Sequence, residues 1–301
     1  PIDALASKHK VTFMEKVDRH ELSEAKTSFK EHGLDRIFLL KLPENSNIKD
    51  AIRDFSTDAN VEYAEPIFKP VPLDDFVPND PYYDSSGLLE NNYKDQYWLH
   101  LIDAEEGWKY ANGSGVIIGY SERFDVSHPE LIGKSHINED EIPNNGIDDD
   151  NDGRVDNYYF GCGNNPCGDL YGHGTAGIGT IIANTNNGQG IAGLAFGAKG
   201  MYDSSFEFRA DQGAKILSHS YSGRSNYDED MLEYVYDNGG TTFVAAGNEN
   251  AYSTTLGTLP TTINVGSVYA ADSRYWSSGF GDTLDVMAPG WNVLTLSSGG
   301  F

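Results

Sequence analysis

The spacing of apolar residues changes along this chain, and the change falls near residue 115. Before that point the apolar runs are short and are mixed with charged residues. They predict a strand at 11–14, a helix at 21–32 that ends at Gly33, a strand at 37–42 that ends at Pro43, a helix from 48 to about 56 capped by Asn47, and a strand that starts within 60–66. This β-α-β-α-β order, with one short strand missing, predicts a small ferredoxin-like α+β unit.

From residue 115 onwards the apolar runs become continuous. Residues 116–120 form such a run, as a strand buried on both faces of a parallel sheet does. Further runs occur at 200–202, 215–218, 242–246, 263–267 and 284–289, and helical patterns such as 227–238 lie between some of them. Strands that alternate with helices predict an α/β fold, with a parallel sheet and helices on both of its faces.

The stretch between these two regions is rich in proline and acidic residues. Pro70, Pro72, Pro78 and Pro81 punctuate it. We therefore expect a first domain at 1–76, a linker or junction at 77–92, and a second domain at 93–301. A length of 301 residues fits two domains at about 150 residues each.

Charge and cysteine content narrow the possible partners. The chain has 46 acidic and 21 basic residues, a net charge of −25, which argues against nucleic acid, since phosphate binding needs basic patches. The excess suits a calcium-rich or salty exterior, or solubility alone. No apolar run reaches about 18 residues, so no membrane span is expected. The chain starts at Pro1 without the features of a signal peptide, so a signal peptide was removed or was not included.

The two cysteines, Cys162 and Cys167, are close together in the sequence. In a secreted protein such a pair forms a small disulfide-closed loop, whereas in a cytosolic protein the thiols would be free or bound to metal. No further cysteine or histidine completes a zinc set.

A histidine between two glycines, at 172–174, precedes an apolar helical run at 176–183. Glycine allows a tight turn and a close approach of substrate, and the start of a helix holds the imidazole rigidly. His173 is therefore a candidate general base. A histidine in an ordinary turn is the alternative.

Residues 148–156 contain five aspartates. They resemble the first nine positions of an EF-hand loop, with Asp148, Asp150 and Asp152 alternating, Gly153 at the turn, a carbonyl from Arg154, and Asp156 closing the loop. Tyr159 stands where such a loop has its bidentate glutamate. Without a cation the aspartates repel one another, so we expect Ca²⁺ here; the alternative is a solvated acidic loop.

Several short motifs occur in the order of a known family. They are His-Pro-Glu-Leu at 128–131, Gly-His-Gly-Thr at 172–175, Ala-Ala-Gly-Asn-Glu at 245–249 and Asp-Val-Met-Ala-Pro-Gly at 285–290. Residues 60–66 resemble the end of that family's propeptide, and residues 78–83 resemble the start of its mature enzyme. Over nearly its whole length the chain resembles a subtilisin-like serine protease (a subtilase) with its inhibitory propeptide attached. The resemblance implies a secreted serine endopeptidase zymogen, with the propeptide blocking the cleft.

The resemblance also implies roles for particular residues. The family triad runs Asp, His, Ser along the chain, and His173 is its histidine. Asn248 corresponds to the oxyanion-hole donor, or else merely ends a strand. The substrate edge maps to Ser218, Ser220, Tyr221, Ser222 and Gly223. Glu130 and Asn187 match a family calcium site, and a surface turn is the alternative for them.

Three departures from the family pattern predict lost catalysis. Counting back from His128 places Ser121 at the aspartate position, and Glu122 could replace the missing carboxylate only if the strand end twists. No Gly-Thr-Ser-x-Ala nucleophile block occurs in the 301 residues. Residues 202–212 are fewer than the family has between the same strands. An extracellular calcium-binding pseudoprotease that serves as a binding or structural module is therefore the alternative function.

The missing nucleophile segment should also contain a central helix that covers the sheet. Its absence would leave an apolar face open, which is a liability in a monomer. We expect a continuation of the chain, a cleaved fragment, a separate chain or a partner to cover that face.

Overall fold

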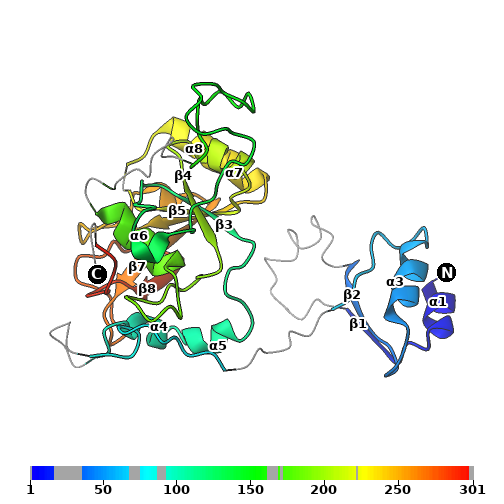
Figure 1. Ribbon diagram of the computed structural model, residues 1–301. Helices are drawn as coiled ribbons and strands as arrows, with labels where there is room; N and C mark the ends of the chain where they lie inside the picture. The colour runs from blue at the N-terminus through cyan, green and yellow to red at the C-terminus, as the bar shows by residue number, and fades with distance from the viewer. Residues whose placement is uncertain are drawn as a thin grey trace. The chain divides into compact units, whose positions relative to one another are not determined.

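The computed structural model describes residues 2–16, 36–67, 75–86, 93–160, 169, 172–221 and 223–297. The chain divides into two compact units, residues 1–70 and 71–301 (Figure 1). The division therefore falls earlier than residue 76, and the described residues from 75 onwards belong to the larger unit.

The N-terminal unit is a small α+β structure. Its described elements are α1 (Ile2–Lys8), β1 (Phe13–Lys16), β2 (Phe38–Lys41) and α3 (Ile48–Ser56). β1 and β2 pair antiparallel, with Phe13 opposite Lys41. The two predicted strands and the predicted second helix are confirmed. The predicted helix at 21–32 lies outside the described residues, so the ferredoxin-like arrangement stays a prediction.

The strand expected to start within 60–66 does not form. The Asp58 carboxylate accepts hydrogen bonds from the Asn60 backbone N–H and side-chain amide, both at 2.9 Å. The Val61 N–H also bonds back to the Asp58 carbonyl. These local bonds make a turn, and the described residues that follow it join no strand ladder.

Asn47 caps α3 as the sequence predicted: its side-chain oxygen accepts the Asp50 backbone N–H at 3.3 Å. We expect Asn47→Ala to destabilise the helix by about 1 kcal/mol, because a first-turn N–H loses its partner. Amide hydrogen exchange in α3 should then accelerate about fivefold. Lys49→Ala, an exposed change in the same helix, is the control. Unchanged exchange in Asn47→Ala would show that the cap contributes nothing.

The large unit is built on a six-stranded sheet in the order β4-β3-β5-β6-β7-β8, and every neighbouring pair is parallel. The strands are β3 (Ile117–Tyr120), β4 (Lys199–Tyr202), β5 (Ile216–His219), β6 (Thr241–Ala245), β7 (Thr262–Val268) and β8 (Val286–Pro289). Each coincides with one of the six apolar runs, so the predicted parallel α/β sheet is confirmed. β3 lies between β4 and β5, so the chain reverses its direction of growth beside β3. Ligand sites of open α/β sheets lie at the carboxyl ends of strands at such a point.

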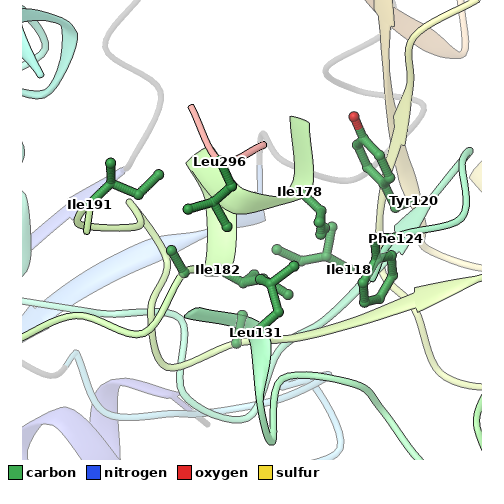
Figure 2. Close-up of a cluster of buried hydrophobic side chains, with 10 residues drawn as sticks. Ile118, Tyr120, Phe124, Leu131, Ile178, Ile182, Ile191 and Leu296 are labelled. Carbon is green, nitrogen blue, oxygen red and sulfur yellow. The ribbon is translucent and has the colours of Figure 1, made fainter. Parts of the chain in front are cut away.

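Helices flank both faces of this sheet. They are α4 (Tyr97–Leu101), α5 (Ala104–Trp108), α6 (His173–Ile182), α7 (Phe206–Asp211) and α8 (Asn226–Asp237), with single turns η2 (Pro129–Leu131) and η3 (Leu256–Thr258). α6 packs on the face that carries Ile118 and Tyr120, and Figure 2 shows Ile178 and Ile182 of α6 in that cluster. α7 and α8 pack on the other face, against Leu217 and Val244.

Part of the α6 side of the sheet has no cover among the described residues. The strand register places Ile216, Phe243 and Val286 on the same face as Ile118. These three side chains are 37%, 36% and 46% exposed. Ile263 and Val265 of β7 continue the same apolar surface and are only half-buried. We call residues 216, 243, 263, 265 and 286 the open face.

Residues 75–86 pack on the large unit instead of forming a free linker. The Phe76 ring contacts Trp108 and Phe196, with centroids 5.7 and 5.2 Å away. Asp80 and Tyr83 are 3% and 1% exposed. Within the described ranges of the chain, no helix is long and apolar enough to cross a membrane.

Candidate active site

The first part of the site is a bend that follows β3. β3 ends at Tyr120, and Ser121 and Glu122 bend away from the strand direction. The Ser121 N–H still bonds to the Ser218 carbonyl of β5 at 3.1 Å, and the Ser121 Oγ accepts the Ser220 N–H at 3.2 Å. Ser121 thus joins two neighbouring chain segments, and its hydroxyl faces the backbone of β5.

The second part is the start of α6. Gly172 has φ = 73°, a left-handed conformation that glycine adopts without strain, and His173 follows as the first helical residue. The Asp169 carboxylate accepts the Thr175 N–H at 2.7 Å and so satisfies a donor of the first turn. The Thr175 hydroxyl accepts the Asp125 N–H at 2.9 Å, which ties the helix to the chain that leaves β3.

These two parts meet at Glu122 and His173. The Glu122 Oε2 lies 2.6 Å from the His173 Nδ1. The Glu122 side chain is 10% exposed and that of His173 is 65% exposed, so one ring nitrogen is held by a buried carboxylate while the ring itself is open to solvent. The predicted candidate general base is therefore oriented by an acid.

The expectation that His173 lacks a carboxylate is wrong, and so is the placement of Ser121 in the aspartate's role. The rule that neighbours point to opposite faces applies inside a strand, whereas β3 has ended before these residues. At the bend the Ser121 side chain turns towards Ser220 and the Glu122 side chain reaches α6. The carboxylate has moved by one position along the sequence.

Charge and burial around this pair favour a proton held on the histidine side. The Glu122 Oε1 is buried and has no partner among the described residues. The neighbouring Tyr120 phenol is 2% exposed. Its pKa is raised to about 12 chiefly by burial, with a smaller effect of the Glu122 and Asp169 charges. Burial, followed by the Glu122 charge, also raises the pKa of Tyr221. Both phenols therefore stay neutral beside the carboxylates.

The predicted substrate edge is brought to this place in part. Ser218 lies on β5 opposite Tyr120, and Ser220 touches Ser121, so both adjoin the bend. Tyr221 follows them and is 49% exposed. Gly223 is exposed, and Ser222 lies outside the described residues.

Asn248 follows β6, so it lies at the same carboxyl edge of the sheet as the bend after β3. It is exposed, and its backbone N–H bonds to the side chain of Glu249. No contact with His173 is recorded among the described residues. Its role as an oxyanion donor stays a prediction.

The acidic loop brings together a set of carboxylates that differs from the predicted one. One oxygen each of Glu141, Asp148 and Asp150 lie within 4.8 Å of one another. Glu141 precedes the EF-hand-like pattern, and sequence analysis missed it.

The remaining predicted ligands of this loop have other partners. The Asp152 carboxylate accepts the Arg154 N–H and the Asn157 side-chain amide, and the Asp156 carboxylate accepts two backbone N–H groups at 145 and 146. The Arg154 guanidinium pairs with Asp203. In the structure Asp152 and Asp156 thus shape the loop around the carboxylate cluster.

The second predicted calcium site gains a residue that the sequence did not indicate. The Asn187 side-chain amide donates to the Glu130 Oε1 at 2.9 Å, while the Glu130 Oε2 is buried and lacks a partner among the described residues. Asp80 accepts the backbone N–H groups of Asn186 and Asn187. Burial raises the pKa of Glu130 to about 7, with the Asp80 charge adding to the effect. Cys162 and Cys167 lie outside the described residues, so their disulfide stays a prediction.

Comparison with known proteins gives a consistent result. The model of the subtilase family, Peptidase_S8, matches residues 73–300. Thermitase from Thermoactinomyces vulgaris is 31% identical over 239 residues, which cover 71% of this chain and 74% of thermitase. A thermophilic serine proteinase from Bacillus sp. (strain AK1) is 28% identical over 275 residues, covering 84% of this chain and 61% of that protein.

An extracellular protease from Xanthomonas campestris is 29% identical over 239 residues, covering 66% of this chain and 41% of that protein. This chain therefore spans less than two thirds of the second and third of these relatives. A solved structure titled as proteases from Pseudoalteromonas arctica PAMC 21717 superposes with a TM-score of 0.50 at 28% identity, covering 71% of this chain and 72% of that one.

Proposed function

This chain belongs to the subtilase family, and we propose that it provides the acid–base pair and substrate edge of a secreted serine endopeptidase. The observation that supports this proposal is the 2.6 Å contact between the Glu122 Oε2 and the His173 Nδ1. A carboxylate in that position holds the imidazole in the tautomer with its proton on Nδ1, and it stabilises the imidazolium that forms when the other nitrogen takes a proton.

In the proposed reaction His173 accepts the proton of a serine hydroxyl as that oxygen attacks the peptide carbonyl, and later gives the proton to the leaving amine. The Asn248 side-chain amide would donate to the carbonyl oxygen as it becomes negative. The serine comes from residues outside this sequence, because these 301 residues contain no Gly-Thr-Ser-x-Ala block. The open face supports this assignment, since an apolar segment is needed to cover it.

Contact with Glu122 weakens the case for a pseudoprotease. That case relied on an imidazole without a carboxylate and on a missing nucleophile, and the first premise no longer holds. The relatives reported above are also named as proteases. We therefore favour an active enzyme once the nucleophile segment is in place.

We propose that residues 1–70 act as the propeptide of this zymogen. The resemblance of residues 60–66 to a propeptide end supports this role. The alignment with the thermophilic serine proteinase covers more of the chain than residues 73–300, so it reaches into the N-terminal unit. Secretion agrees with the net charge of −25 and with a relative named as extracellular.

Calcium is the cofactor that we propose for the site of Asp80, Glu130 and Asn187. The Glu130 side chain is 0% exposed, and an oxygen that has no partner there needs a proton or a cation. The donors are carboxylate and amide oxygens, which Ca²⁺ prefers. Bound there, the ion would supply structural stability and take no part in proton transfer.

The test is covalent labelling of the full-length protein with a serine-reactive fluorophosphonate. The coding sequence beyond residue 301 is read first for a Gly-Thr-Ser-x-Ala block, and that serine is changed to alanine in a control. We expect the wild-type protein and Ser121→Ala to be labelled, and both His173→Ala and the serine variant to stay unlabelled. A folded wild-type protein that resists labelling would overturn the proposed activity.

A further inference from the structure

Glu141 is a buried acid that lacks a partner for one of its oxygens. Its side chain belongs to a residue that is 3% exposed, although the chain around it forms a surface loop. The Oε1 accepts the Asp149 N–H at 2.8 Å and the Asp150 N–H at 3.4 Å. The Oε2 is buried and has no hydrogen-bond partner among the described residues. An ionised carboxylate is costly to bury in this state unless a cation or a proton joins it.

The same carboxylate lies beside two others. An oxygen of Glu141 and one each from Asp148 and Asp150 are within 4.8 Å of one another. Three negative charges at this spacing repel strongly, and the loop holds them there by directed bonds. Asp148 accepts the N–H groups of Asp152 and Gly153, and Asp150 accepts the side-chain amide of Asn138 at 2.7 Å.

We propose that this loop binds one divalent cation between Glu141, Asp148 and Asp150, with Glu141 as the buried ligand. All three donors are oxygens, and two of them come from a flexible half-exposed turn, which suits Ca²⁺ better than the small octahedral Mg²⁺. An EF-hand-like loop takes its closing acid from the twelfth position, which is Tyr159 here. Glu141 supplies that acid from the residues before the loop.

The cation would also fix the position of Arg154. The Arg154 guanidinium makes two bonds to the Asp203 carboxylate, at 3.0 and 3.1 Å, and lies 3.9 Å from the centre of the Phe208 ring. Asp203 also accepts the N–H of Ser205, the residue that caps α7. The loop is thus attached to the beginning of α7, and ordering the loop should order that helix. This inference does not depend on proteolytic activity.

Glu141→Gln is an informative variant. Glutamine keeps an oxygen for the two backbone N–H groups and replaces the unpaired oxygen by an amide, so the loop retains its shape while losing the charge. Glu139→Gln is the matched control, because Glu139 is exposed and lies outside the cluster. Glu130→Gln reports on the other calcium site separately.

The experiment is calcium titration by calorimetry, together with melting temperatures in calcium and in chelator. We expect Glu141→Gln to lose one binding event or to bind at least tenfold more weakly, while Glu139→Gln binds as the wild type does. In chelator Glu141→Gln should melt at or above the wild-type temperature, and in calcium below it. Asp148→Asn should show the same loss of binding.

A structural role for Glu141 without a cation predicts a different pattern. In that case Glu141→Gln would melt lower in both conditions and bind calcium as well as Glu139→Gln does, which would overturn the proposal. Loss of binding in Glu130→Gln alone would likewise place the only calcium elsewhere. Unchanged binding in Glu130→Gln would bear on the site at Asp80 and leave the Glu141 result to stand by itself.

Discussion

Glu122→Gln should lower kcat/KM of the full-length protein by about four decades, the loss that serine proteases show when the carboxylate behind the histidine becomes an amide. This corresponds to about 5.5 kcal/mol of transition-state stabilisation. Glutamine fits the same space but presents no negative charge, and its amide can donate to the Nδ1 and so favour the wrong tautomer. Steady-state kinetics on a peptide substrate measure the effect.

The matched control for this variant is Ser121→Ala at the neighbouring position. Its hydroxyl accepts a backbone N–H and does not touch the imidazole, so we expect a loss of less than tenfold. Proton NMR gives a second readout that needs no nucleophile. The Nδ1–H of His173 should appear far downfield in the wild type and in Ser121→Ala, and should be absent in Glu122→Gln. If the two variants lose activity equally, Glu122 has no special role.

Gly174→Ala should be the most damaging single methyl group that can be added near the site. A Cβ at this position would lie 1.9 Å from the Arg123 carbonyl oxygen and 3.1 Å from the Glu122 Cβ. Both obstacles belong to the bend that carries the carboxylate, so the first turn of α6 must move away from it. We expect a loss of about 3 kcal/mol, at the upper end of what overpacking costs, and a longer distance between Glu122 and His173.

Denaturant unfolding followed by tryptophan fluorescence measures this loss. All four tryptophans lie in the large unit, so the signal reports on that unit alone. Gly107→Ala is the control: a Cβ there would meet nothing within 4 Å, and the residue lies inside α5. It should stabilise the unit by up to about 1 kcal/mol through helix propensity. Equal effects of the two substitutions would contradict the close contact at Gly174.

The large sheet could be predicted from the sequence because its strands are buried on both faces. A run such as 116–120 is apolar without interruption, and no surface segment of that length has a reason to be so. The cap at Asn47 was equally legible, since its side chain acts on a residue three positions away. Features that depend on neighbours in sequence were therefore predicted correctly.

The carboxylate beside His173 could not be located in this way. Periodicity assigns a direction to each side chain only while the strand continues, and β3 ends one residue before Ser121. Whether Glu122 reaches the histidine depends on where α6 lies, and the two residues are 51 positions apart. Family spacing pointed to Ser121 because spacing counts residues and takes no account of the bend.

The metal loop shows the same limit. The aspartates at 148–152 were recognisable from their alternation, but the acid that joins them, Glu141, lies outside the pattern. Asp152 and Asp156 fitted the pattern, yet their oxygens hold the loop's own amides. Which carboxylates in an acidic stretch remain available to an ion depends on hydrogen bonds that composition does not reveal.

The open face has a consequence for how this polypeptide behaves when it is produced alone. Phe243, Val286 and their neighbours present a flat, water-repelling surface with no acidic residue among its five members. Two molecules pressed together there would hide it from solvent, so light scattering should grow with concentration despite the strong net charge. Whatever segment normally lies on this surface acts as a built-in solubiliser, and preparations should include it from the start.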